Sequence, residues 1–221
     1  YEFPETVQIP AGECTSLLPI DFALKDLDQV DKWVMPLAIQ SNDPSHNYQA
    51  NPRKFYRRAM LRISPFNDYS GQYSATVYFK GNEKEAIVPE YHTSYVIDDK
   101  TIFFYAGLID IDRLDRKYYK IKFEFTEEKI DLQTRKLKIS SDNEDINLVV
   151  KGQPSYTVEE EMDATRPYLK HIYVTINNLE YEFTDYTSVP GYPLEYVVKG
   201  SLTMERKINT QIPDEDQAIE W

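Results

Sequence analysis

The stretch Pro65-Phe66-Asn67-Asp68-Tyr69-Ser70-Gly71-Gln72-Tyr73 decides the fold, because here a polar turn containing glycine leads directly into an alternating sequence. One parity after the turn is apolar and consists of Tyr73, Ala75, Val77 and Phe79. The other parity carries Gln72, Ser74, Thr76 and Tyr78. Alternation with period two predicts a β-strand that has one buried face. We therefore expect the chain after this turn to form one closed β-unit.

Further strands follow at regular intervals. Tyr95-Val96-Ile97 and Ile102-Phe103-Phe104 flank Asp98-Asp99-Lys100-Thr101, and this spacing predicts a tight hairpin. Two later stretches alternate in the same way. In the first, two lysines and a glutamate separate the apolar residues Tyr119, Ile121, Phe123 and Phe125. In the second, lysines alternate with Leu137 and Ile139. One apolar and one polar face is typical of strands in antiparallel sheets.

The segment Ile172–Phe183 predicts a second hairpin, with Asn177-Asn178 as a two-residue turn that tolerates a left-handed backbone. This turn creates three apolar pairs: Ile176 with Leu179, Val174 with Tyr181, and Ile172 with Phe183. A register shifted by one residue would instead place these residues against Glu180 and Glu182. The turn and the pattern therefore agree.

The last long strand extends from Leu194 to Lys207 and alternates over its whole length. It is longer than an ordinary strand, and Gly200 in its middle offers the bend that closure of a barrel needs. A closed barrel of about eight strands fits residues 65–207.

The N-terminal part of the chain predicts a separate, smaller β-unit. Val7–Glu13 indicates the end of a strand and a turn, Leu17–Leu24 an extended segment, and Trp33–Ile39 a strand with Pro36 at an edge or bulge. Two or three strands cannot bury both of their faces, so this unit resembles part of a β-sandwich. The polar stretch Ser41–Pro52 marks the boundary, with domains expected at 1–44 and 53–221.

Composition excludes several classes of function. The chain has 25 Lys plus Arg against 37 Asp plus Glu, and its net charge of -12 would repel nucleic acid. Cys14 is the only cysteine, so neither an intramolecular disulfide nor a cysteine-based metal site is expected. The longest apolar run, Ile102–Ile109, is much too short to span a membrane.

The sequence carries no catalytic or metal-binding motif. Asp110, Asp112 and Asp115, like the run Asp142-Asn143-Glu144-Asp145, lack the glycine and distal glutamate of an EF-hand and are interpreted as solvated turns. The histidines share no ligand spacing, and His171 is expected on the outer face of its strand. We expect neither an enzyme nor a cofactor. A pair of carboxylates of the glycosidase kind stays open, because spacing in the sequence does not give distance in space.

Two parts of the chain resemble a known family. Val7–Glu13 together with Trp33–Ile39 is similar to the immunoglobulin-like domain (domain-of-unknown-function family 1735) at the N-terminus of exported Bacteroidetes lipoproteins. Pro65–Tyr73 and the terminal stretch Arg206–Trp221 resemble the lipocalin-like domain (domain-of-unknown-function family 4361) that follows it. The resemblance implies an all-β chain, with a partial immunoglobulin-like β-sandwich followed by a lipocalin-like antiparallel β-barrel.

The resemblance also implies a setting. Such lipoproteins are anchored by a lipid at the outer membrane or cell surface, with a periplasmic location as the other choice, and are linked to Sus-like loci for polysaccharide uptake. Their partners would be a glycan ligand and Sus-like outer-membrane proteins. Cys14 lies within a folded stretch and is not the expected anchor. The expected function is a non-catalytic glycan-binding or accessory protein of the cell envelope. The alternatives are a carrier of a small apolar ligand in the barrel lumen and a purely structural envelope subunit.

The predicted ligand-binding residues are Asp185, Tyr186 and Tyr192, in the loop Thr184–Pro193. Sugar rings pack their flat C–H faces on aromatic rings, and their hydroxyls need fixed polar partners. Pro190 and Pro193 restrict the backbone and would lower the ordering cost of binding. The alternative is that both tyrosines fold back and cover the end of the barrel. In that case the search moves to Tyr48, Tyr91 and His92.

Gly71 and Tyr73 also resemble a second lipocalin feature. In lipocalins a Gly-x-Trp motif on the first strand is covered by an arginine from the last strand. Gly71-x-Tyr73 and Arg206 look like a variant of that arrangement. We expect the guanidinium of Arg206 to lie over the ring of Tyr73 at one end of the barrel.

Overall fold

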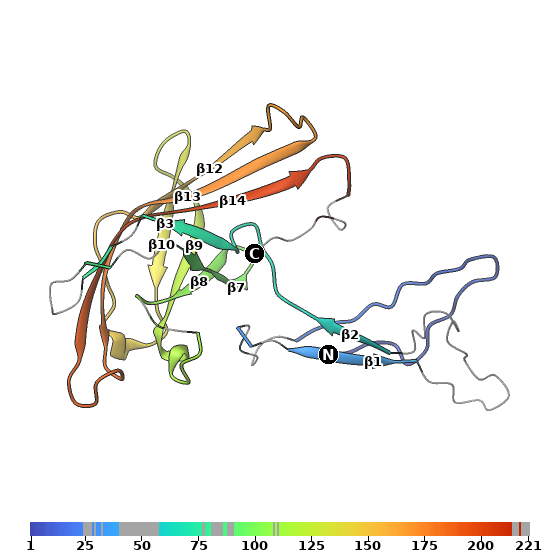
Figure 1. The fold of residues 1–221 in the computed structure, drawn as a ribbon, viewed down its shortest axis with the longest axis horizontal. Coiled ribbons are helices and arrows are strands. Elements are labelled where there is room, and N and C mark those ends of the chain that lie inside the picture. The colour runs from blue at the N-terminus through green and yellow to red at the C-terminus, as the bar shows by residue number, and fades with distance from the viewer. Residues whose placement is uncertain are drawn as a thin grey trace. The chain divides into compact units, whose positions relative to one another are not determined.

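The computed structural model describes residues 1–23, 28, 30–31, 33–39, 58–76, 78–80, 86–87, 91–107, 109, 111–213 and 217. The chain divides into two compact units, Tyr1–Ser64 and Pro65–Trp221. Almost all of the regular structure is β, as Figure 1 shows, and the described helices are two short 3-10 turns.

The N-terminal unit contains one described strand pair. The strands β1 (Val34–Ala38) and β2 (Arg58–Arg62) are antiparallel, with Pro36 opposite Met60. The strand predicted around Pro36 is therefore confirmed as β1. Residues 17–23 contribute only an isolated bridge, between Asp21 and Glu2.

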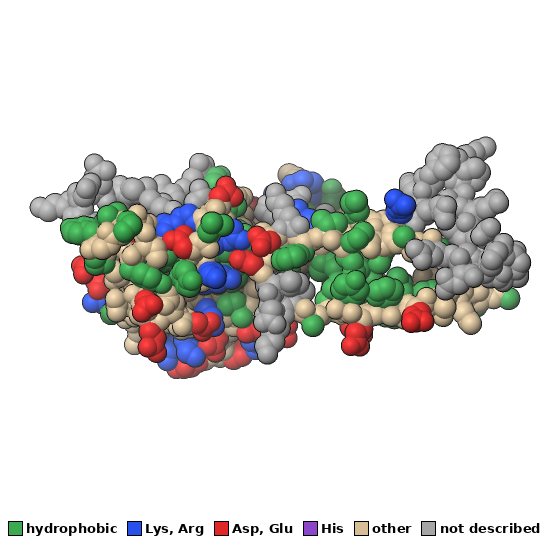
Figure 2. Space-filling view, turned by 90° about the horizontal axis from the view of Figure 1, so that it is seen from below, with side chains coloured by type: hydrophobic (Ala, Val, Ile, Leu, Met, Phe, Trp, Pro, Cys, Tyr) green, Lys and Arg blue, Asp and Glu red, His purple; other side chains and the backbone are tan. Residues whose placement is uncertain are grey.

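Many large apolar side chains of this unit are exposed, and Figure 2 shows hydrophobic side chains gathered on its surface. The most exposed are Leu17 at 92%, Met60 at 80% and Tyr1 at 71%. A two-stranded sheet offers no second layer to cover such residues. The identification of residues 1–44 as part of an immunoglobulin-like sandwich stays a prediction.

The C-terminal unit is one large antiparallel sheet, ordered β5-β4-β14-β13-β12-β10-β9-β8-β7, with β3 pairing β14 and β6 (Figure 1). Its strands are β3 (Gln72–Ala75), β4 (Tyr78–Lys80), β5 (Ala86–Ile87), β6 (Tyr91–Thr93), β7 (Tyr95–Asp98), β8 (Thr101–Tyr105), β9 (Lys120–Lys129), β10 (Thr134–Ser140), β11 (Val149–Val150), β12 (Ser155–Met162), β13 (Leu169–Asp185) and β14 (Leu194–Asn209), and its 3-10 turns are η2 (Arg116–Tyr119) and η3 (Glu144–Ile146). The all-β fold class and the barrel-like antiparallel sheet are confirmed.

The core fills the inside of this sheet, and it follows the predicted alternation. The apolar positions from Tyr119 to Phe125 are at most 1% exposed, and Leu137 and Ile139 are buried as well. The hairpin predicted around Asp99-Lys100 is formed by β7 and β8. Aromatic rings dominate the interior, and Tyr69 stacks on Phe125 with ring centroids 3.9 Å apart.

The stretch Pro65–Tyr73 links two sides of the nearly closed sheet. The amide of Gly71 donates to Ser94 Oγ (2.9 Å), and the amide of Ser94 donates to the Gly71 carbonyl (2.9 Å). The buried Asn67 donates from Nδ2 to the carbonyl of Asp98 (2.7 Å), in the β7–β8 turn. Because buried polar groups need such partners, the turn joins β3 to the β6–β7–β8 side of the sheet.

Arg206 binds the same stretch, but the predicted partner was wrong. Its Nη2 donates to the carbonyls of Asn67 and Ser70, both at 3.0 Å, and its guanidinium lies 4.3 Å from the ring centroid of Phe66. Tyr73 is instead fully buried and donates from its hydroxyl to the Tyr69 carbonyl. The Arg206 side chain is itself only 17% exposed, and this burial lowers the pKa of Arg206. Its Nη2 therefore needs the carbonyls of Asn67 and Ser70 as acceptors in place of water.

The hairpin predicted at Asn177-Asn178 was also wrong. These residues form a bulge inside the continuous strand β13, where the register against β14 shifts between Ile176 and Leu179. Asn178 takes a left-handed backbone with φ +54°, and Gly200 on β14 lies opposite Leu179. The extra residue switches which alternate side chains point inward. Val174 and Ile176 before the bulge therefore face the core together with Leu179 and Tyr181 after it.

We expect the N-terminal unit to open more readily than the barrel. Its amides around Ile20 and Ile39 belong to a unit whose described residues bury little apolar area, whereas Val174 is 1% exposed in the central strand β13. Native-state hydrogen exchange should therefore show much weaker protection near Ile20 and Ile39 than near Val174. Equal protection at the three positions would contradict the division into units of unequal stability.

Candidate functional site

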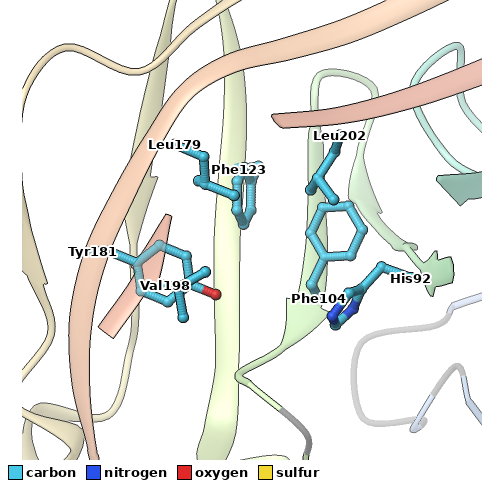
Figure 3. Close-up of a pocket in the computed structure, with 7 residues that line it drawn as sticks. All are labelled: His92, Phe104, Phe123, Leu179, Tyr181, Val198 and Leu202. Atoms are coloured by element: carbon cyan, nitrogen blue, oxygen red, sulfur yellow. The ribbon is translucent and has the colours of Figure 1, made fainter. Parts of the chain in front are cut away.

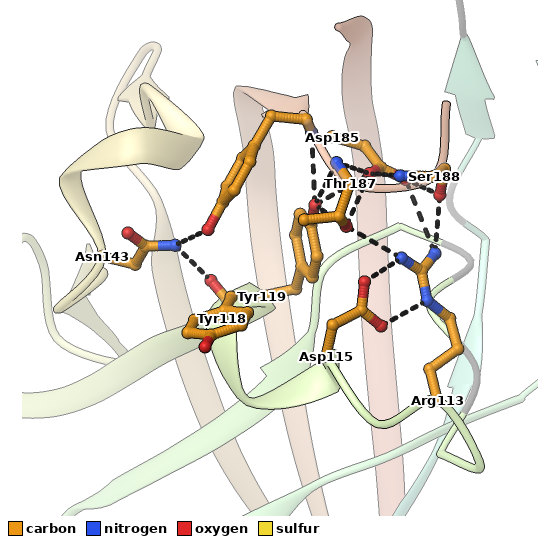
Figure 4. A network of polar contacts seen from close by, with 9 residues as sticks. Arg113, Asp115, Tyr118, Tyr119, Asn143, Asp185, Thr187 and Ser188 are labelled. Carbon is orange, nitrogen blue, oxygen red and sulfur yellow. Dashed lines mark hydrogen bonds and ion pairs between the residues drawn. The ribbon is translucent and has the colours of Figure 1, made fainter. Parts of the chain in front are cut away.

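One end of the barrel is built from three segments that a network of polar contacts holds together (Figure 4). They are the loop that follows β13, the segment 111–119 that ends in η2, and the turn η3. At its centre lies Asp185, the last residue of β13, which is 2% exposed. Its Oδ1 accepts from the hydroxyl of Tyr119 (2.8 Å) and from the amide of Ser188 (3.0 Å), and the Ser188 hydroxyl donates to Oδ2.

Arg113 connects this carboxylate to a second one. Its Nε and Nη2 donate to the two oxygens of Asp115 at 2.8 and 2.6 Å, a bidentate pair. Its Nη1 also donates to Ser188 Oγ (2.7 Å) and lies 3.6 Å from an oxygen of Asp185. The guanidinium carbon is 5.5 Å from the ring centroid of Tyr119. The two loops are thus held together through one arginine.

Both carboxylates of the network are stabilised in the ionised form. Hydrogen bonds from Arg113 and Thr187 hold the pKa of Asp115 well below its usual range. Burial alone would raise the pKa of Asp185, but hydrogen bonds from Ser188 and Tyr119 lower it overall. A glycosidase needs one carboxylic acid whose pKa is raised. Both shifts are downward, so neither Asp115 nor Asp185 matches that acid.

The structure separates the three predicted ligand-binding residues. Asp185 is buried, with both oxygens already engaged. Tyr186 packs against the core, and its hydroxyl accepts from Asn143 Nδ2 (3.0 Å). Tyr192 is 59% exposed, in a turn where its amide donates to the Val189 carbonyl (3.0 Å). Of the two tyrosines, one is therefore exposed as expected and the other folds back.

Several residues of this end were missed from the sequence. Arg113, Tyr119 and Asn143 hold the loop from positions 43 to 75 residues away, and no local pattern signals such contacts. The network also leaves apolar side chains at the surface of these loops, with Leu114 97%, Tyr118 43% and Val189 42% exposed. The network therefore holds residues 185–188 at the start of the loop, and Tyr192 lies in the exposed turn that follows them.

Among the described residues, large side chains fill much of the barrel interior. Figure 3 shows one cavity between them, which is lined by His92, Phe104, Phe123, Leu179, Tyr181, Val198 and Leu202. Its volume is about 10 Å³, which is room for about one water molecule. Burial in this lining lowers the pKa of His92, so its neutral form is favoured. Pockets that hold drug-sized ligands measure about 300–1,000 Å³.

The described residues form neither a metal site nor a membrane-spanning helix. Nowhere in the described ranges do three or more His, Cys, Asp or Glu side chains gather as they would around a metal ion. Within the same ranges, no helix has the length and apolar character needed to cross a membrane. His46 and Tyr48 lie outside the described residues, and Tyr91 is 54% exposed on β6.

Two family models match the chain. A model described only as a "-like, C-terminal" domain matches residues 57–203, and a domain of unknown function, DUF4973, matches residues 1–44. The second differs from family 1735, which the sequence of residues 1–44 resembles. No curated protein matches the chain.

Several solved structures of Bacteroides proteins are similar to the chain. An auxiliary nutrient binding protein from Bacteroides thetaiotaomicron is 46% identical, with a TM-score of 0.78, and the match covers 100% of this chain and 71% of that one. A protein of unknown function from Bacteroides ovatus is 40% identical, with a TM-score of 0.80 and coverage of 98% and 71%. A multidomain protein including DUF1735, also from Bacteroides ovatus, is 42% identical, with a TM-score of 0.78 and coverage of 100% and 74%. The first of these relatives is described as a binding protein and the second as a protein of unknown function, and neither is described as an enzyme.

Proposed function

Because the chain belongs to the family of Bacteroides proteins that share this C-terminal domain, we propose that it is a non-catalytic accessory protein of the cell envelope that binds glycans. The name of one relative, an auxiliary nutrient binding protein, supports a binding role. A lipid anchor at the outer membrane or cell surface and Sus-like uptake proteins as partners belong to the same proposal. Cys14 is exposed in the N-terminal unit and is not the proposed anchor.

The observation that carries the proposal is the exposed ring of Tyr192, in a loop whose start is held by hydrogen bonds and whose end continues into β14. The Asp185–Arg113 contacts hold the start of the loop, and Pro193 leads into β14. A ring that is already ordered binds a flat sugar face with little further loss of conformational entropy. In this proposal Tyr192 contacts the sugar, whereas Asp185 and Tyr186 keep the loop in place.

The small cavity argues against the alternative of an apolar carrier in the lumen. A cavity of about 10 Å³ would need a large rearrangement of Phe104 and Phe123 before it could take a ligand of several carbon atoms. A purely structural envelope subunit remains the competing function, and the binding experiment below separates it from the proposal.

A glycan array probed with the purified chain tests the proposal, followed by calorimetry on any glycan that binds. We expect Tyr192→Ala to weaken binding at least about tenfold, which corresponds to a loss of about 1.4 kcal/mol. The melting temperature should stay nearly unchanged, because Tyr192 is 59% exposed and surface substitutions have small effects.

The matched control is Tyr168→Ala, which removes another exposed tyrosine, 38% exposed in the turn between β12 and β13. It should leave glycan affinity unchanged. If the unmodified chain binds no glycan on the array, the structural alternative is favoured. If a glycan binds equally well to the Tyr192→Ala variant, another surface is used, and Tyr91 becomes the next residue to replace.

A further inference from the structure

A second cluster of charged groups lies on the extended part of β12, β13 and β14, which run side by side in Figure 1. In the register of this part, His171 on β13 lies opposite Glu161 on β12 and opposite Lys207 on β14. The turn 163–168 joins β12 to β13. It is closed by hydrogen bonds from the Asp163 amide to the Leu169 carbonyl (2.9 Å) and from the Leu169 amide to the Arg166 carbonyl (2.8 Å).

The imidazole of His171 bridges this turn to β14. Its Nδ1 is 2.5 Å from Glu205 Oε1 on β14, and its Nε2 is 3.3 Å from Asp163 Oδ2 in the turn. The side chain was expected at the surface, but it is only 13% exposed on the outer face of the sheet. One ring therefore bridges the Asp163 end of the turn to β14, although β13 separates β12 from β14. The Tyr168 end of the turn is bonded separately, because the Tyr168 carbonyl accepts from the amide (2.8 Å) and the hydroxyl (2.9 Å) of Thr210, just after β14.

Asp163 is also the organising residue of the turn. Its Oδ1 accepts from the amides of Thr165 and Arg166, both at 2.8 Å, and its Oδ2 accepts from the guanidinium of Arg166 (2.9 Å). Hydrogen bonds from Thr165 and Arg166 hold the pKa of Asp163 well below its usual range. The turn therefore presents an ionised carboxylate to His171.

Both ring nitrogens of His171 face carboxylate oxygens, so the protonation state of the ring decides whether both contacts are attractive. Only the imidazolium carries a proton on both nitrogens, whereas the neutral ring turns one lone pair toward a carboxylate. The other charged and titratable groups near the ring are Glu161, Arg166, Lys207 and Tyr173. Lys207 Nζ lies 3.9 Å from Glu205 Oε2, and the Tyr173 hydroxyl donates to Glu205 Oε1 at 3.4 Å.

We propose that His171 is a pH-sensitive tether that holds the Asp163 end of the 163–168 turn against β14 while the ring is protonated and releases that end when the ring is neutral. Hydrogen bonds from the ring to Glu205 and Asp163 raise the pKa of His171 above its usual value. A group whose pKa is raised in the folded state contributes its full stabilisation below the unfolded value of about 6.5. This contribution is lost as the pH rises through the folded value.

The test uses the full chain and two NMR measurements over a range from about pH 5.5 to about pH 8.5, which brackets the ordinary histidine value. The first follows the ring protons of His171 and should give a pKa above 6.5. The second measures protection factors of the Asp163 and Leu169 amides, which remove the intrinsic pH dependence of exchange. We expect the protection factors of both amides to fall about twofold to tenfold toward high pH. This change corresponds to the free energies typical of exposed and charge-assisted contacts.

Two variants control this experiment. His171→Gln cannot become charged, so its protection factors at Asp163 and Leu169 should be low and independent of pH. Lys207→Gln removes a cation beside Glu205 but leaves the bridge, so the pH dependence should persist. A His171 pKa at or below 6.5, or the same pH dependence in the chain and in His171→Gln, would overturn the proposal.

Discussion

Phe123→Ala is expected to lower the free energy of unfolding by about 3–5 kcal/mol, because it removes a large ring from a packed interior. Phe123 is 1% exposed on β9, and its ring lies 5.0 Å from the ring of Phe104 in an edge-on arrangement. Urea unfolding measures the loss as a lower midpoint with an unchanged slope. Leu132→Ala is the matched control, since Leu132 is 96% exposed and its removal should cost less than about 0.5 kcal/mol.

The same variant bears on the question of a carrier. Phe123 lines the small lumen cavity, so its removal should create a void that small apolar molecules can enter, whereas the unmodified chain should bind none. Binding of a long-chain apolar ligand by the unmodified chain, displaced by a second such ligand, would instead favour the carrier. A loss below about 1 kcal/mol for Phe123→Ala would contradict the packed lumen.

Alternation in the sequence was sufficient to predict most of the barrel, because one-sided burial depends on period-two patterning. It was not sufficient at Asn177-Asn178. A two-residue turn and a bulge both place Ile176 and Leu179 on the same face, so the local pattern cannot separate them. The choice depends on tertiary pairing: β12 and β14 flank β13 on both sides and keep it continuous. Closure by Asn67 and Ser94 is likewise a contact between distant segments.

The candidate site shows the same limit. The composition of the 184–193 loop indicated an aromatic, conformationally restricted segment, and Tyr192 is exposed there. Whether Tyr186 is exposed as well depends on Asn143, which binds its hydroxyl from 43 residues away. The role of Asp185 depends on Tyr119 and Arg113 in the same way. The pattern of a single sequence indicates local backbone conformation and average side-chain burial. It does not indicate which distant side chain completes a hydrogen bond.

Asp185→Ala is expected to cost about 3–5 kcal/mol of stability, because several donors lose a buried acceptor at once and each unsatisfied buried donor costs about 1–3 kcal/mol. The substitution leaves the Tyr119 hydroxyl and the amides of Thr187 and Ser188 without their shared acceptor. It also leaves Arg113 with Asp115 as its remaining carboxylate partner among the contacts described. Asp142→Ala is the matched control, because that side chain is 82% exposed and its pair with Lys122 should be worth at most about 1 kcal/mol.

The cost of Asp185→Ala should depend on pH in a defined direction. The pKa of Asp185 is lowered in the folded chain, so its stabilisation is present above the unfolded value of about 3.9 and is lost as the pH falls through the folded value. Denaturant unfolding should therefore show the full difference in unfolding free energy between the two chains near neutral pH and a smaller difference in acid.

The glycan affinity of Asp185→Ala should fall as well, although Tyr192 is retained, because the loop would have to be ordered on binding. A stable variant with unchanged affinity would show that the Asp185 network does not position the loop, and a difference that grows in acid would contradict the lowered pKa.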